Sequence, residues 1–243
     1  MTIFAALLLL PLQTAPPQAA TPAPVAGVDA ERIAVAGQVA RVTNSEALTT
    51  AQIDKMLNET FPKVFGGDPD MAALEKEYPG LIKALIAAVG PPLRAQTMRE
   101  LPKLWERLAG VYARHFTTAE LRELLGFYPG PAGTRLIAGV ARSMDYSELM
   151  TDMMRNDTSV VTAEGMLAGQ RAGVRGALQE LTSEDRAQLV QFGLSETGRK
   201  IWRVTPELRA IVVAWSNEGT AAEEALIEKI AADTVTAFIG EKK

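Results

Sequence analysis

The sequence predicts an all-α protein, a helical array of about ten helices, and three observations support this. Apolar residues recur at spacings of three and four along most of the chain after residue 29, as one face of a helix requires. Side chains typical of helix N-termini precede these segments, in two places followed by proline. No segment shows the alternation of apolar and polar residues that predicts a half-buried strand.

The expected helices follow from these signals in chain order. An aspartate or threonine before a proline provides an N-cap and a proline in the first turn, where its missing N–H costs nothing. The expected starts and spans are Asp29, Asp68-Pro69, Leu93–His115 with a bend at Pro102, Thr205-Pro206 and 221–239.

The first 28 residues differ from the rest of the chain. The segment Ile3–Leu12 is a ten-residue apolar run, as long as the apolar part of a secretory signal and too short to span a bilayer. We therefore expect a signal peptide at 1–20, a Pro/Ala-rich linker at 21–28 and a single all-helical domain at 29–243 in the periplasm. No Lys or Arg precedes the apolar run, so a buried N-terminal strand or helix is the alternative.

The composition excludes several classes of function. The net charge is −4 and no cluster of five or more basic residues occurs, so nucleic acid is not an expected partner. The absence of cysteine excludes disulfides, thiolate catalysis and zinc–thiolate sites. We expect no metal, no cofactor and no transmembrane span in the mature form.

The segment Phe116–Ile137 specifies a helical hairpin. Thr117 and Glu120 form a capping box, in which each side chain satisfies a free backbone N–H of the other residue. Phe116 and Leu121 occupy the two positions of a hydrophobic staple, which fixes the angle at which the chain enters the helix.

The turn of this hairpin is equally well marked. The sequence Tyr128-Pro129-Gly130-Pro131 ends the first helix, and Pro131 suits the first position of the next one. Gly133 allows that next helix to begin close to its neighbour. Both ends of the hairpin are therefore predicted from local residues alone.

These residues resemble a family of exported bacterial proteins, domain of unknown function 2059. The resemblance covers about residues 95–155, although Pro129-Gly130 replaces the polar residues usual in the turn. It implies an all-helical periplasmic protein and no catalytic or binding residue. The residues that carry it are His115, Phe116, Thr117, Glu120, Phe127, Tyr128 and Gly133.

A similar pattern recurs 65 residues later, at 181–202. The identical pairs are Thr117 and Thr182, Leu124 and Leu189, Phe127 and Phe192, and Gly133 and Gly198. We therefore predict a duplicated hairpin, with repeats at 95–155 and 160–220. Arg186 stands where the staple has Leu121, so the alternative is that unrelated helices use the same capping solution.

Methionines and arginines mark a possible binding surface in and after the second helix of the hairpin. Its residues are Met150, Met153, Met154, Arg171 and Arg175. Thioethers are ligands for Cu(I), but methionine more often fills a core or an adaptable apolar groove. We therefore predict a binding surface here and no metal site.

Glycines at every fourth position form a second candidate surface. Gly165, Gly169 and Gly173 each cost about 1 kcal/mol in a helix relative to alanine, so they need a structural reason. Close approach of another helix is such a reason, either within the chain or in a homodimer, and the alternative is a flexible, interrupted helix.

His115 is the only histidine, which excludes multi-histidine metal sites. We expect it to be structural, because a helix C-terminus favours its positive form. The leading functional hypothesis is a non-catalytic protein of the cell envelope that binds an unknown protein or peptide. The alternatives are a hydrolase-type enzyme using His115 with a nearby carboxylate, and a structural homodimerisation module.

Overall fold

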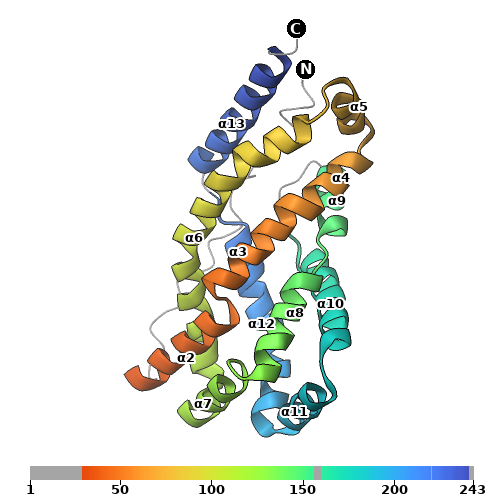
Figure 1. The fold of residues 1–243 in the computed structure, drawn as a ribbon. Helices are drawn as coiled ribbons and strands as arrows, with labels where there is room; N and C mark the ends of the chain where they lie inside the picture. Colours follow the sequence, from red (N-terminus) through yellow and green to blue (C-terminus); the bar gives the residue numbers. More distant parts are fainter. Residues whose placement is uncertain (1–28, 156–159, 220, 241–243) are drawn as a thin grey trace.

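The computed structural model describes residues 29–155, 160–219 and 221–240 (Figure 1). These residues form helices and no strand, which confirms the all-α prediction. The expected signal peptide at 1–20 and linker at 21–28 lie outside the described residues. The elements are α2 (Ala30–Thr43), α3 (Glu46–Lys55), a π-helical turn η1 (Met56–Thr60), α4 (Phe61–Gly67), α5 (Pro69–Glu77), α6 (Leu81–His115), α7 (Thr118–Phe127), α8 (Pro131–Ser143), α9 (Ser147–Arg155), α10 (Ala163–Glu180), α11 (Ser183–Leu194), α12 (Glu196–Ser216) and α13 (Ala221–Gly240).

Two predicted helix starts are confirmed by their caps. The N–H of Arg32 donates to Oδ1 of Asp29 at 2.7 Å, which caps α2. Asp68 caps α5 by accepting from the N–H of Met71 at 2.9 Å, and Pro69 takes the first helical position.

Two other predicted boundaries are wrong, because prolines lie inside helices that tertiary packing stabilises. Helix α6 begins at Leu81 rather than Leu93 and continues through Pro91, Pro92 and Pro102 for 35 residues. Each proline removes one backbone hydrogen bond, but the buried residues along α6 pack into cores on both sides of the prolines.

Helix α12 shows the same effect at Pro206. Its N-cap is Ser195, whose hydroxyl accepts from the N–H of Gly198 at 2.9 Å. The Thr205 hydroxyl donates to the Ile201 carbonyl at 2.8 Å, so Thr205 acts inside the helix and not as its cap.

Two apolar clusters lie along the length of α6. The first packs α2, the C-terminal half of α6, α7 and α12 around residues such as Leu108, Leu121 and Leu124. The second packs α4, α5, the N-terminal half of α6 and α13 around residues such as Phe65 and Leu81. Figure 1 shows α13 beside the N-terminal half of α6, and α7 and α11 near each other at the opposite end. None of the helices in the described ranges is both long enough and apolar enough to cross a membrane.

Candidate functional site

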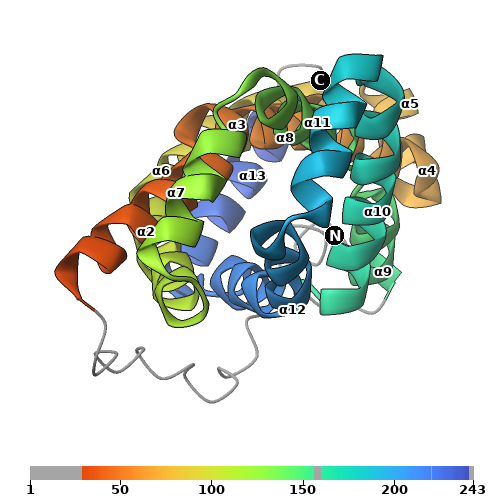
Figure 2. The same ribbon diagram turned by 90° about the horizontal axis from the view of Figure 1, so that it is seen from below.

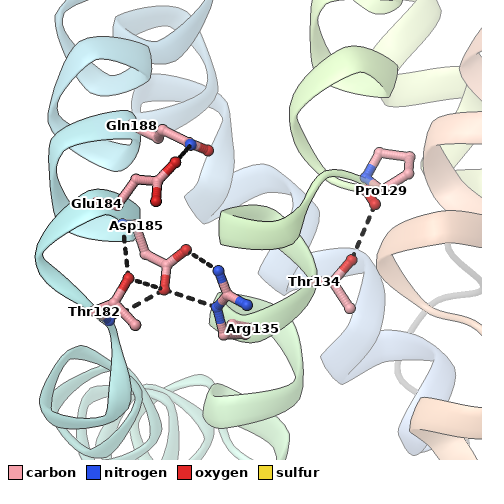
Figure 3. Close-up of polar contacts among 7 residues, drawn as sticks. All are labelled: Pro129, Thr134, Arg135, Thr182, Glu184, Asp185 and Gln188. Carbon is pink, nitrogen blue, oxygen red and sulfur yellow. Dashed lines mark hydrogen bonds and ion pairs between the residues drawn. The ribbon is translucent and has the colours of Figure 1, made fainter.

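Two helical hairpins share one design at the end of the molecule that holds α7 and α11. The first hairpin is α7 and α8, which follow the C-terminal half of α6; the second hairpin is α11 and α12, which follow α10. In the first, the N–H of Thr117 donates to Glu120 at 2.7 Å, and the N–H of Glu120 donates to the Thr117 hydroxyl at 3.3 Å. In the second, Thr182 and Asp185 exchange the same bonds at 3.0 and 3.1 Å (Figure 3).

The turns of the two hairpins are also alike. A methyl group on Gly133 would overlap the carbonyl oxygen of Phe127, six residues earlier. A methyl group on Gly198 would overlap the carbonyl oxygen of Phe192, again six residues earlier. Both turns therefore require glycine for the same close approach of backbone to backbone.

The contacts between the hairpins are reciprocal. The rings of Phe127 and Phe192, at matching positions, stack with centroids 4.0 Å apart and planes 4° apart. Arg135 of α8 forms an ion pair with Asp185 of α11, with Nε donating at 2.7 Å (Figure 3). At the positions 65 residues away, Lys200 of α12 pairs with Glu120 of α7.

A two-fold arrangement requires that each contact between the hairpins occur twice, with the matching residues exchanged. The helices show the same exchange: α8 of the first hairpin packs along α10, which precedes the second, while α12 of the second packs along α6, which precedes the first. That one hairpin arose from the other by duplication stays a prediction.

The two carboxylates in these ion pairs have lowered pKa values. The Arg135 guanidinium holds the pKa of Asp185 well below its usual range, against the opposing effect of burial, and Thr182 adds a second donor. Burial raises the pKa of Glu120, but hydrogen bonds from Lys200 and Thr117 outweigh it and lower the pKa overall. Both carboxylates are therefore ionised at neutral pH and join the two hairpins.

The hairpins differ in what covers them. Helix α2 lies against the C-terminal half of α6 and against α7 (Figure 2). Its residues Ala36, Val39 and Ala40 are fully buried. The residues of α6 and α7 that share their cluster include Ala109, Ala113, Leu121 and Leu124, each 7% exposed or less.

Polar contacts hold α2 at both ends. Glu31, near its start, forms an ion pair with Arg122 of α7. The carbonyl of Asn44, just after its end, accepts a hydrogen bond from the indole of Trp105 at 2.7 Å. These contacts fix α2 across the junction of α6 and α7.

The matching face of the second hairpin is open. Val174 and Leu178 of α10 stand 65 residues after Ala109 and Ala113, and their exposed fractions are 37% and 41%. Val190 and Leu194 of α11 are 60% and 67% exposed. We call this surface the open face and define it by Val174, Leu178, Leu189, Val190 and Leu194.

Three arginines lie on the two helices of the open face, α10 and α11. Arg171 and Arg175 share one side of α10 with Val174 and Leu178, because residues three and four apart are neighbours on a helix. Both are exposed, and neither has a carboxylate partner among the described residues. The exposed Arg186 of α11 donates to the carbonyl of Leu178 at 3.2 Å and likewise pairs with no described carboxylate.

The comparison with known proteins bears on the first hairpin. Residues 102–155 match the family model "Uncharacterized protein conserved in bacteria (DUF2059)". This confirms the predicted resemblance over that segment, which runs from the second half of α6 through α9. The second hairpin lies outside the DUF2059 segment. No curated protein and no solved structure matches the chain.

Within the DUF2059 segment, His115 lies at the exposed end of α6. Its Nε2 is 2.7 Å from Oε2 of Glu207 of α12, and Arg114 donates to the other oxygen at 2.5 Å. Burial raises the pKa of Glu207, but the bonds from Arg114 and His115 lower it overall. The group is thus an ion-pair cluster joining α6 to α12. Over 29–155, 160–219 and 221–240, no three or more acidic or histidine side chains are grouped to hold a metal ion.

The predicted glycine stripe packs inside the chain. A methyl group on Gly169 would lie 2.9 Å from the carbonyl oxygen of Asp145, and one on Gly173 would lie 2.8 Å from that of Val140. A methyl group on Gly165 would lie 2.6 Å from Leu149. The stripe therefore packs against α8, α9 and the loop between them, with Gly169 and Gly173 buried.

The methionines and arginines of the predicted binding surface lie on different helices, α9 and α10. Met150 is half-buried on α9, which packs against α4 and α10. The side chains of Met153 and Met154 lie outside the described residues. Arg171 and Arg175 instead border the open face, whose apolar residues sequence reasoning missed. The available signal was Arg186 at the position of the buried Leu121, since an exposed side chain there indicates an uncovered helix.

Proposed function

We propose that this protein is a non-catalytic binding protein of the bacterial cell envelope and that it binds a protein partner through the open face. The single observation that carries the proposal is the difference between the hairpins. Helix α2 covers the first, where Leu125 is partly buried against the core, whereas on the second the matching Val190 is 60% exposed. Exposed apolar patches with a polar border are typical of protein interaction sites.

Matched substitutions test this proposal. The full chain is used as bait on envelope extracts of its own cells, beside the variants Val190→Asp and Leu194→Asp. Controls are Ile33→Asp and Leu226→Asp, because those side chains are 47% and 51% exposed and lie on α2 and α13. A partner retained by the controls and lost by both open-face variants supports the proposal. Retention of every partner by all four variants contradicts it.

The enzyme alternative has one observation in its favour, the contact between His115 and Glu207. Two features argue for a structural role instead. Both side chains are about 40% exposed, at 41% and 40%, and Arg114 shares the carboxylate. Loss of a hydrolytic activity in both His115→Gln and Glu207→Gln, with unfolding unchanged, would support the enzyme.

Export is a separate part of the proposal, and it rests on the apolar run Ile3–Leu12 followed by small residues and prolines. Fusion of residues 1–28 to a phosphatase that is active only outside the cytoplasm tests it. We expect activity from the fusion and none after Leu8→Arg and Leu9→Arg, which interrupt the apolar run. Equal activity from both fusions would contradict export by this segment.

A further inference from the structure

We infer that the open face binds a single amphipathic α-helix of another protein, with small apolar residues on its contact side and carboxylates beside them. This inference rests on the proposed function and specifies its partner. It follows from two independent observations, the seating of α2 on the first hairpin and the charge around the open face.

The first observation is that the chain itself contains a template for the occupant. On the first hairpin, the buried residues of α2 are Ala36, Val39 and Ala40, at positions i, i+3 and i+4, which lie on one side of a helix. The open face offers the matching junction between a long helix, α10, and a short one, α11. A helix is therefore the element whose shape this junction accepts.

The open face is shorter than the seat of α2 at one end. Trp105 donates to the end of α2, but the matching residue Gln170 accepts a hydrogen bond from Arg209 of α12 at 2.7 Å. The occupant is thus expected to lie over Val174, Leu178 and Val190 and to end before Gln170.

The second observation is the charge. Three positions on this face carry arginine: Arg171, Arg175 and Arg186. The residues 65 positions earlier, on the first hairpin, are Glu106, Gly110 and Leu121, and none of them is positively charged. The acidic residues nearest in sequence are engaged elsewhere, since Glu180 pairs with Arg142 and Glu184 accepts from Gln188. Complementarity across an interface therefore calls for carboxylates on the partner.

The same charge argues against two other occupants. Two copies meeting through this face would place the same arginines opposite one another, because a two-fold interface pairs a patch with itself. The segment 1–28 of the chain carries no aspartate or glutamate. An acidic helix of another protein satisfies both the shape and the charge.

Two synthetic peptides with the sequence of residues 29–44 test the inference. In the acidic peptide, Arg32, Gln38 and Arg41 are replaced by glutamate; in the basic control, Glu31 and Gln38 are replaced by lysine. Binding to the full chain is measured by fluorescence anisotropy. We expect the acidic peptide to bind at least roughly tenfold more tightly than the basic one, and Val190→Asp to abolish this binding.

Charge reversal separates specific binding from general attraction. The variant Arg171→Glu with Arg175→Glu should prefer the basic peptide, whereas Lys83→Glu, an exposed cation on the N-terminal half of α6, should leave the preference unchanged. Equal binding of both peptides overturns the inference. The inference is also overturned if the chain binds vesicles of phosphatidylethanolamine and phosphatidylglycerol and Val190→Asp abolishes that binding. It is likewise overturned if the chain forms a dimer that Val190→Asp abolishes.

The outcomes distinguish this inference from the proposed function. If an envelope partner is lost with Val190→Asp but is unaffected by reversal of Arg171 and Arg175, the binding function stands and the acidic helix is wrong. If no partner depends on Val190, the proposed function itself fails.

Discussion

The two hairpins are built alike but covered differently. Each begins with a capping box, requires a glycine after its turn and contributes one phenylalanine to the stack between them. Yet Leu124 of the first is fully buried, while the matching Leu189 of the second is half-buried and its neighbour Val190 is exposed. Local sequence therefore specifies the hairpin, whereas an added helix determines which of its faces remains exposed.

The largest effect is expected from removal of the same side chain in both hairpins. Leu124→Ala should lower the free energy of unfolding by about 3 kcal/mol, because it leaves a cavity in a covered core. Leu189→Ala should cost about 1 kcal/mol, because its site is partly solvated. Urea unfolding measures both values. Equal losses would mean that the two faces are equally covered.

Substitution of the two turn glycines should lower the stability of the protein by similar amounts in both hairpins. Gly133→Ala and Gly198→Ala should each destabilise by about 2 kcal/mol, since the added methyl meets backbone in both cases. The controls are Gly126→Ala in the first hairpin and Gly193→Ala in the second, both with open space around them, and each should stabilise by about 0.5 kcal/mol. Thermal unfolding provides the test, and a large loss in only one hairpin would break the correspondence.

The stack between the hairpins should be energetically coupled. A double-mutant cycle of Phe127→Leu and Phe192→Leu is expected to give a coupling energy of about 1 kcal/mol, in keeping with a direct aromatic pair. The control cycle pairs Phe127→Leu with Phe65→Leu in the second apolar cluster, and it should give none. Additive losses at 127 and 192 would exclude the stacked contact.

The smallest effect concerns pH. The folded-state pKa of Glu120 is lowered from 4.5, so its contribution is present above that value and disappears as the pH falls through the folded-state pKa. Glu120→Gln should therefore be less stable than the wild type by under about 1 kcal/mol near neutral pH, and the two should converge in acid. The exposed Glu106→Gln should follow the wild type throughout. A constant difference at all pH values would contradict the ion pair.

Local features of the fold were predictable, and long-range ones were not. The capping box of Thr117 and Glu120 and the close turn at Gly133 depend on neighbouring residues, so the sequence specifies them. The passage of α6 and α12 through prolines depends on distant packing, and there the prediction failed. Arg171 and Arg175 were recognised as candidates from their pattern.

The apolar part of the site was beyond sequence reasoning. Val174 and Leu178 are apolar residues on a helix, and their sequence does not show that no helix covers them as α2 covers the first hairpin. The spacing of the glycine stripe indicates a close approach, but the segments that it meets, α8, α9 and the loop between them, are visible only in three dimensions.

Site-specific photocrosslinking in living cells tests most directly whether the open face binds a helix of another protein. A photoreactive amino acid replaces Val190 in one strain and the similarly exposed Leu226 of α13 in another. We expect an adduct only at position 190, to a helical segment of another protein that contains carboxylates, and a weaker adduct when Arg171 and Arg175 are reversed. The absence of an adduct at 190, or an adduct between two copies of this chain, would contradict binding of an acidic helix by the open face.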